Sequence, residues 1–204
     1  MSGDLDMHVL ELMTARLCHE LAGPLSAVVN GVELMGDDDP DFVADAIKLV
    51  GASARTASRR LQFYRFAYGS LPGDGTAASV GRDLAMKYFE GGNVTCDWPL
   101  GEPRPFPWQR LACLLVILGA EALPRGGRVS LTGDARHVTM IADGDMVRLI
   151  PEAHAGLQPE VAIDHMTARG VHAYLCQRFA ADLGLKIGSV TAEPRRLKIE
   201  IEPG

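Results

Sequence analysis

The sequence predicts an α+β protein, in which an N-terminal antiparallel helical hairpin precedes a two-layer α/β sandwich. Three observations predict this class. Apolar residues recur at steps of three and four over residues 10–68, short alternating runs follow later, and a stretch rich in glycine and proline separates them at residues 69–76. The first spacing is typical of amphipathic helices and the alternation of half-buried strands. We therefore expect a hairpin in residues 1–70 and a second domain in residues 77–204.

The first region predicts two long helices. The apolar stripe of the first helix consists of Leu10, Met13, Leu17, Leu21, Leu25, Val28, Val32 and Met35. Gly36 ends this helix, and the acidic residues before Pro40 supply an N-cap and a proline at the first position of the next helix. The same spacing then continues in Phe42, Ala46, Leu49, Ser53, Ala57, Leu61, Tyr64 and Tyr68.

A tight turn between two long helices produces an antiparallel hairpin. One hairpin cannot bury an apolar stripe of this length by itself. Pairing with a second copy covers the stripe, so the pattern predicts a homodimer held together by a four-helix bundle.

The second region predicts helices and short strands in turn. The expected helices are Ser79–Phe89, Trp108–Leu123 and Ala168–Leu183, and the expected strands are Asn93–Asp97, Val129–Thr132, His137–Ala142, Met146–Ile150, Lys186–Thr191 and Arg196–Glu202. The last strand is the clearest, because Leu197, Ile199 and Ile201 alternate with charged residues. Helices on one face of an antiparallel sheet would form the two-layer sandwich.

Composition excludes several functional classes. The 20 Lys and Arg against 26 Asp and Glu give a net charge of 20 − 26 = −6, which disfavours binding to nucleic acid. The longest apolar run, Leu114–Leu118, is too short to span a membrane, and the acidic start of the chain lacks an export signal. The cysteines form no CxxC pair, so we expect reduced thiols in a cytoplasmic protein at Cys18, Cys96, Cys113 and Cys176.

His19 does not fit a purely structural helix. At about 100° per residue it lies on the side opposite the apolar stripe, and it should project into solvent. Its neighbours on that side are mostly small or polar: Leu12, Ala15, Arg16, Gly23, Ser26 and Asn30. Such a helix face is an accessible platform that carries one imidazole.

Pro24 is a second anomaly in the same helix. It removes an amide donor and clashes with the carbonyl of Glu20, at a cost of about 3 kcal/mol in a helix interior. Gly23 adds a penalty of about 1 kcal/mol. A helix that needs a local bend beside a reactive histidine has a reason to accept both residues, whereas a structural helix has little.

These residues suit phosphoryl transfer, because a neutral imidazole is a nucleophile near pH 7. We expect Glu20 to hold the tautomer of the His19 ring and Arg16 to neutralise a phosphoryl group. An ordinary surface histidine is the alternative interpretation. Metal binding is disfavoured, because the second histidine of an HExxH motif is replaced by Gly23.

The segment His19–Leu25 (HELAGPL) resembles the H-box of two-component histidine kinases, in which an acidic residue follows the phosphorylated histidine. The second region resembles their ATP-binding domain in the order of its elements, but the nucleotide motifs are missing. No magnesium-binding Asn occurs in Leu115–Gly127, the Asp-x-Gly-x-Gly loop is reduced to Ala142–Met146, and the lid motif to Thr167–Ala173.

Together with the run HELAGPLSAVVNGVE, this combination is similar to the ChpT-like histidine phosphotransferases of alphaproteobacterial phosphorelays. The resemblance implies a dimer that takes phosphate from the receiver domain of a hybrid kinase and passes it to receivers of response regulators. His19 then matches the phosphoacceptor. Ser26, Ala27 and Asn30 match the stretch that determines receiver specificity, and Leu12 and Gly23 lie on the same platform.

The resemblance also implies that no cofactor or metal binds this chain, since the magnesium would belong to the receiver. Gly23 replaces the Thr or Asn with which many kinases orient a hydrolytic water, so reversible transfer is expected more than hydrolysis. Two alternatives stay open: an ATP-dependent histidine kinase with unusual motifs, and a non-catalytic dimeric module that binds two-component proteins.

Two charged groups have open interpretations as well. Arg55, Arg59 and Arg60 on the second helix could dock an acidic receiver or could be solvated charges. Asp143 and Asp145 could form an acidic pair for a metal or could belong to a turn between two strands.

Overall fold

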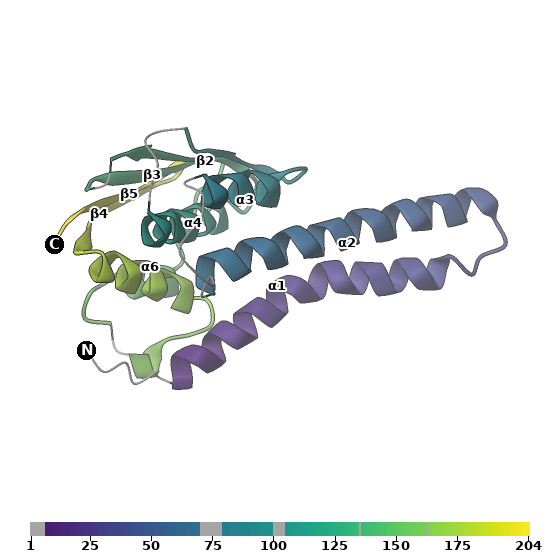
Figure 1. The fold of residues 1–204 in the computed structure, drawn as a ribbon, viewed down its shortest axis with the longest axis horizontal. Coiled ribbons are helices and arrows are strands. Elements are labelled where there is room, and N and C mark those ends of the chain that lie inside the picture. Colours follow the sequence, from purple (N-terminus) through teal and green to yellow (C-terminus); the bar gives the residue numbers. More distant parts are fainter. Residues whose placement is uncertain (1–6, 70–78, 100–104, 135, 162) are drawn as a thin grey trace.

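The computed structural model describes residues 7–69, 79–99, 105–134, 136–161 and 163–204 (Figure 1). It contains a long helical hairpin and an α+β region, which confirms the predicted fold class. Residues 70–76 of the expected linker lie outside the described residues, so the domain boundary stays a prediction. In the described part of the chain, no helix is both long and apolar enough to cross a bilayer.

The hairpin consists of α1 (Met7–Leu34) and α2 (Pro40–Tyr68). The predicted turn is confirmed, because the Asp39 carboxylate accepts a hydrogen bond of 2.9 Å from the backbone of Asp41, and Pro40 opens α2. The helices approach closely at Gly31. A Cβ atom there would lie only 2.6 Å from a methyl group of Val50, so this crossing requires glycine.

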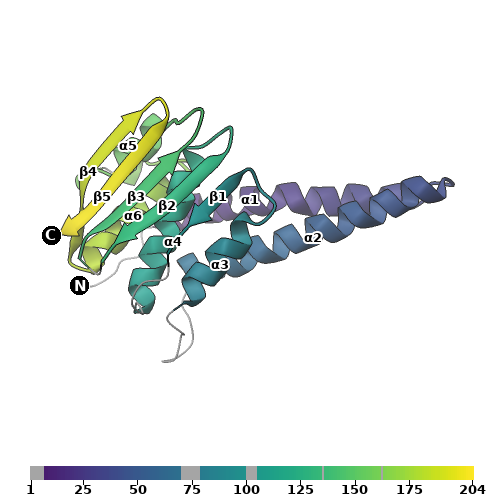
Figure 2. The same cartoon turned by 90° about the horizontal axis from the view of Figure 1, so that it is seen from above.

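The second region is a five-stranded sheet with helices packed on one face (Figure 2). Its helices are α3 (Val80–Phe89), α4 (Phe106–Glu121), α5 (Pro151–Gly156), the short 3-10 helix η1 (Ile163–His165) and α6 (Val171–Asp182). Its strands are β1 (Val94–Asp97), β2 (Gly127–Gly133), β3 (Val138–Asp143), β4 (Leu185–Glu193) and β5 (Arg196–Pro203).

The strand order is β1-β2-β3-β5-β4, and the sheet is mixed. β1 pairs parallel with β2, and the other neighbours pair antiparallel. The expectation of a fully antiparallel sheet was therefore wrong at one edge. The reason is the long connection through α4, which returns the chain to the same end of the sheet before β2 begins.

The strand expected at Met146–Ile150 was also wrong. The amide of Val147 donates to the carbonyl of Pro194 at 3.0 Å, and that of Arg148 donates to Ala122 at 2.8 Å, so neither joins a ladder. β3 is already paired on both sides, by β2 and β5, and offers no edge to this segment. The chain continues instead into α5 and η1, which were not predicted.

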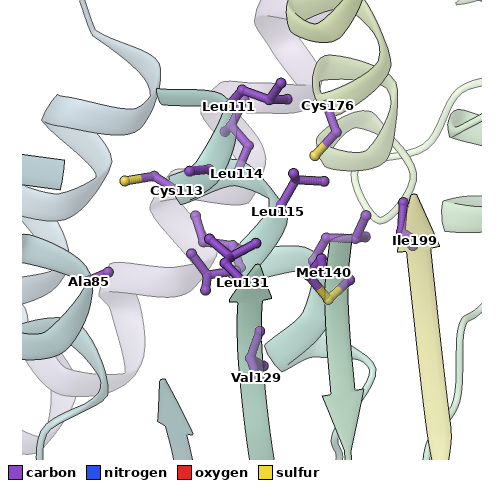
Figure 3. Packing of buried hydrophobic residues seen from close by; sticks show 14 of the residues in the cluster. Ala85, Leu111, Cys113, Leu114, Leu115, Val129, Leu131, Met140, Cys176 and Ile199 are labelled. Atoms are coloured by element: carbon purple, nitrogen blue, oxygen red, sulfur yellow. The ribbon is translucent and has the colours of Figure 1, made fainter. Parts of the chain in front are cut away.

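The core of the second domain surrounds α4, which packs on β2 and β3, contacts α3 and α6, and also contacts α2. Figure 3 shows buried residues of this core. Residues 111–119 of α4 are all buried, because a helix that is apolar on every side must be covered on every side. Gly119 lets α4 approach the sheet, since a Cβ there would lie 2.7 Å from the Met140 sulfur and 2.9 Å from a Val129 methyl.

Candidate functional site

The side of α1 that carries His19 is exposed, as the sequence predicts. Exposed residues one, two and three turns further along the same side are Gly23, Ser26 and Asn30. A Cβ atom placed on Gly23 would meet no atom within 4 Å, so the approach to His19 is open from this direction. The structure thus brings the predicted phosphoacceptor and three predicted partner-binding residues onto one accessible surface.

The other two predicted partner-binding residues are less accessible. Ala27 is half-buried. Leu12 packs against a small apolar cluster formed by Met13, Met166 and Val171, where the start of α1 meets η1 and α6. Leu12 therefore contributes to the contact between the hairpin and the second domain.

Pro24 leaves the carbonyl of Glu20 without the amide donor that an uninterrupted helix provides. In Figure 1, α1 changes direction near the middle of its length. Arg60 of α2 takes over the missing hydrogen bond, because its Nη1 donates to the Glu20 carbonyl oxygen at 2.6 Å. The same nitrogen lies 3.4 Å from the Glu20 carboxylate. The anomaly in α1 is thus compensated by a side chain of the neighbouring helix.

The Glu20 carboxylate points toward α2 and α3. It accepts a hydrogen bond of 3.2 Å from the Tyr64 hydroxyl, which lies 2.9 Å from the hydroxyl of Tyr88. Burial raises the pKa of both tyrosines. The expected bond from the His19 ring to Glu20 is not formed among the described residues, because adjacent helix positions point about 100° apart. Glu20 joins α1 to the rest of the protein.

Arg16 also has a different place from the expected one. Its guanidinium forms an ion pair with Glu121 at the end of α4 and donates to the Ala168 carbonyl at 3.4 Å. Only 11% of the Arg16 side chain is exposed. Because these partners hold the guanidinium against the second domain, Arg16 does not extend toward the exposed ring of His19.

A buried histidine completes the junction between the hairpin and the second domain. The ring of His172, in α6, lies between the Tyr68 hydroxyl at 2.7 Å and the Leu114 carbonyl at 2.8 Å. Because a carbonyl can only accept, Nε2 carries the proton, and Nδ1 accepts from Tyr68. Burial lowers the pKa of His172 to about 3, so the ring stays neutral. Its role is structural.

The end of α2 is held by the second domain in another way. Arg110 of α4 donates to the carbonyls of Ala67 at 3.2 Å and of Tyr68 at 3.1 Å. The last carbonyls of a helix have no partner within the helix, and a cation there also interacts favourably with the helix dipole. Sequence periodicity gave no indication of this contact, since the partners are more than 40 residues apart.

A cleft of about 540 Å³ lies beside Glu20, between α2, the turn that joins α3 to β1, and the end of α4. The three arginines singled out in the sequence, Arg55, Arg59 and Arg60, all line it. Arg59 pairs with Glu90 at 2.6 Å, while Arg60 bonds to Glu20. Glu90 could not be assigned to this surface from the sequence, since it lies in a turn without a motif.

The acidic pair near β3 is accounted for by arginines. Arg196 makes two hydrogen bonds to Asp143, of 2.6 and 3.1 Å, and Arg195 makes one of 3.0 Å to Asp145. Asp143 is the last residue of β3 and Asp145 lies in the bend that follows, with no second strand directly after it in the described chain, so these ion pairs account for the two acids in place of the predicted turn between two strands. Within the described ranges, no group of three or more His, Cys, Asp or Glu side chains could hold a metal ion.

Comparisons with known proteins identify the family. The model of the histidine phosphotransferase C-terminal domain matches residues 81–195. The chain is 35% identical to the protein phosphotransferase ChpT of Brucella abortus (strain 2308) over 195 residues, which cover 89% of this chain and 90% of that relative.

A solved structure of a bacterial phosphotransferase superimposes with a TM-score of 0.79 at 30% identity. This superposition covers 99% of this chain and 98% of the other, so the hairpin and the second domain are both shared. The chain with the exposed His19 on its helical hairpin therefore belongs to the ChpT-like histidine phosphotransferase family.

Proposed function

We propose that this chain is a phosphorelay carrier, which accepts a phosphoryl group on His19 from one receiver-domain aspartate and donates it to another. The observation that carries the proposal is the exposed imidazole of His19 beside the proline-interrupted turn of α1. The resemblance of His19–Leu25 to a kinase H-box and the 35% identity to a phosphotransferase support the same role.

The proposed reaction is a displacement at phosphorus. A neutral ring nitrogen of His19 attacks the phosphorus of the aspartyl phosphate, an N–P bond forms, and the acyl P–O bond breaks. The electron pair of that bond leaves with the aspartate carboxylate, and the proton on the other ring nitrogen goes to solvent. Transfer to the second receiver reverses these steps at a new aspartate.

The receiver would hold the magnesium ion that this chemistry uses, and His19 would supply only the nucleophile. Exposed Gly23, Ser26 and Asn30 would contact the receiver, because they share the helix side of His19. We place the donor receiver on a hybrid histidine kinase and the acceptor receivers on response regulators, in the cytoplasm. The family resemblance supports this assignment.

We also propose that the working form is a homodimer with a four-helix bundle. Leu25, Val29 and Val32 of α1 and Ile47 and Leu61 of α2 are each more than half exposed in the single chain. Because Gly31 of α1 faces Val50 of α2 where the helices meet, helical spacing turns both stripes to the same side of the hairpin, and on α1 this stripe lies about 110° from His19. A second copy could cover the apolar stripes and leave His19 accessible.

We further propose that the second domain binds no ATP. The motifs of an ATP-binding domain are missing from its sequence, and Glu121 at the end of α4 is engaged by Arg16 of α1. The lid-like segment packs directly on α5, since a Cβ on Gly156 would lie 2.6 Å from the carbonyl oxygen of Gly170. These contacts support a domain that positions the hairpin.

The experiment that tests the proposal is transfer from a phospholabelled receiver to wild-type protein and to His19→Ala. We expect acid-labile, base-stable label on wild type only. The absence of label on both proteins, across several receivers, would favour a non-catalytic dimeric module.

A further inference from the structure

We propose that Arg60 is a positioning residue for phosphotransfer, because it replaces the backbone hydrogen bond that Pro24 removes next to His19. This inference deepens the proposed function and rests on it. Arg60 belongs to α2, does not contact the phosphoryl group in this role, and acts through the backbone of Glu20. This role of Arg60 therefore cannot be predicted from the residues of the H-box alone.

The first step of the argument is the unusual acceptor. A carbonyl inside an α-helix normally accepts from the amide four residues later, and for Glu20 that residue is Pro24, which has no amide hydrogen. A carbonyl left without a donor in mid-helix is open to water, and inserted water is a known cause of bending. In this structure, Arg60 Nη1 donates a hydrogen bond of 2.6 Å to this carbonyl oxygen.

The second step is that Arg60 holds Glu20 at two points. Besides the carbonyl, the guanidinium approaches the Glu20 carboxylate at 3.4 Å, and that carboxylate also accepts from Tyr64 one turn further along α2. About a third of the Arg60 side chain is exposed. Main chain and side chain of Glu20 are thus both fixed to α2.

The third step concerns His19. It shares a peptide bond with Glu20, so the orientation of the Glu20 backbone helps to set the direction in which the His19 side chain leaves the helix. An in-line attack on phosphorus requires a defined distance and direction, and a misplacement of about 1 Å can lower a rate by about a hundredfold. Arg60 is therefore expected to affect the transfer step itself.

A different role for Arg60 would be direct attraction of an acidic receiver, since it lines the cleft with Arg55 and Arg59. The two roles differ in their dependence on Pro24. Attraction between charges does not require the proline. The positioning role does, because an alanine at position 24 would supply the amide donor that Glu20 lacks.

The experiment is a double-mutant cycle of Arg60→Met and Pro24→Ala in the full-length chain, measured by single-turnover transfer from a phosphorylated receiver. Methionine keeps an apolar stem but no donor. Arg59→Met is the matched control, because Arg59 lines the same cleft and pairs with Glu90. Circular dichroism checks that each variant keeps the wild-type helicity.

We expect Arg60→Met to lower the rate at saturating receiver about tenfold in the Pro24 protein and less than twofold in the Pro24→Ala protein. Arg59→Met should raise the half-saturating receiver concentration by a similar factor in both backgrounds. Arg60→Lys, which keeps one donor, should recover most of the rate. If Arg60→Met fails to fold, Arg60→Gln, whose side chain is too short to reach the Glu20 carbonyl, is compared with wild type in the two backgrounds.

Equal effects of Arg60→Met in both backgrounds would overturn the positioning role, as would a change only in the half-saturating concentration. If wild type transfers phosphate but the effects of Arg60→Met and Pro24→Ala are additive, the proposed function stands and only the positioning role fails. Absence of transfer by wild type from every receiver would overturn both. The two failures are therefore distinguishable.

Discussion

The hydroxyl of Tyr68, in the last turn of α2, donates a hydrogen bond of 2.7 Å to Nδ1 of His172 in the first turn of α6. These residues are 104 positions apart, and the His172 side chain is fully buried. A satisfied polar contact in a buried site fixes the relative position of two elements more closely than apolar packing does. The hairpin that carries His19 is thus joined to the second domain by a specific bond.

Substitution of His172 is expected to weaken the fold. His172→Phe would remove the hydrogen bonds that join its ring to the Tyr68 hydroxyl and the Leu114 carbonyl in a buried site, each at a cost of about 0.5–1.5 kcal/mol. Urea unfolding at pH 7 measures the loss. An unchanged midpoint would show that the network contributes nothing to stability.

The same residue predicts a pH dependence. Burial lowers the pKa of His172 from 6.5 to about 3, so between these values the unfolded chain binds a proton that the folded chain does not. Stability contributed by His172 is complete above pH 6.5 and falls by about 1.4 kcal/mol per unit as the pH decreases toward 3. Urea unfolding from pH 7 to 4.5 should show this slope, and His172→Phe should lack its contribution.

His19→Ala is expected to abolish transfer while helicity and dimer mass stay unchanged, because an exposed side chain contributes little packing. His8→Ala is the matched control on the same helix. The His8 ring bonds to the Met166 carbonyl at 3.3 Å and lies three turns before His19, so its loss should leave the label intact. Loss of helicity in His19→Ala would contradict the exposed position.

A charged substitution tests whether the apolar stripes of the hairpin form the proposed dimer interface. Leu61→Asp should halve the mass measured by light scattering, because dimerisation would bury an unpaired carboxylate. Leu49→Asp is the control. The sequence spacing puts Leu49 on the same stripe as Leu61, but Leu49 is exposed about 120° from Leu61 on α2, away from the proposed dimer contact. Equal masses for both variants would contradict this interface.

The two glycines of α1 should respond in opposite ways. Gly23→Ala is expected to stabilise the protein by about 1 kcal/mol, because alanine is the better helix former and nothing lies within 4 Å of the new methyl group. Gly31→Leu should destabilise it by about 1–3 kcal/mol, since even a Cβ there lies 2.6 Å from Val50. Thermal unfolding of both variants measures the contrast.

Nucleotide titration separates the phosphotransferase from an ATP-dependent kinase. We expect no heat of binding for ATP with magnesium at micromolar to millimolar concentration in calorimetry. Magnesium-dependent binding in the micromolar range would favour the kinase alternative. Aspartyl-phosphate transfer measured in the same preparation provides the positive control for folded, active protein.

The hairpin, its turn at Asp39–Pro40 and the exposure of His19 could all be predicted from the sequence. These features depend on residues within a few positions of one another, so helical periodicity and capping preferences are enough to predict them. The alternation of apolar and charged residues predicted β5 correctly for the same reason. Alternation misled at Met146–Ile150, because β3 has no free edge, and edges are decided by pairing across the whole sheet.

The partners of the polar groups around His19 depend instead on how distant parts of the chain pack together. Arg16 forms an ion pair with Glu121, which is 105 positions away. Glu20 accepts hydrogen bonds from Arg60 and Tyr64 on the other helix. Local spacing shows which side of a helix a residue occupies, but not which distant group reaches it. That pairing is set by the packing of α1 against α2 and α6, which places donors and acceptors within hydrogen-bonding distance.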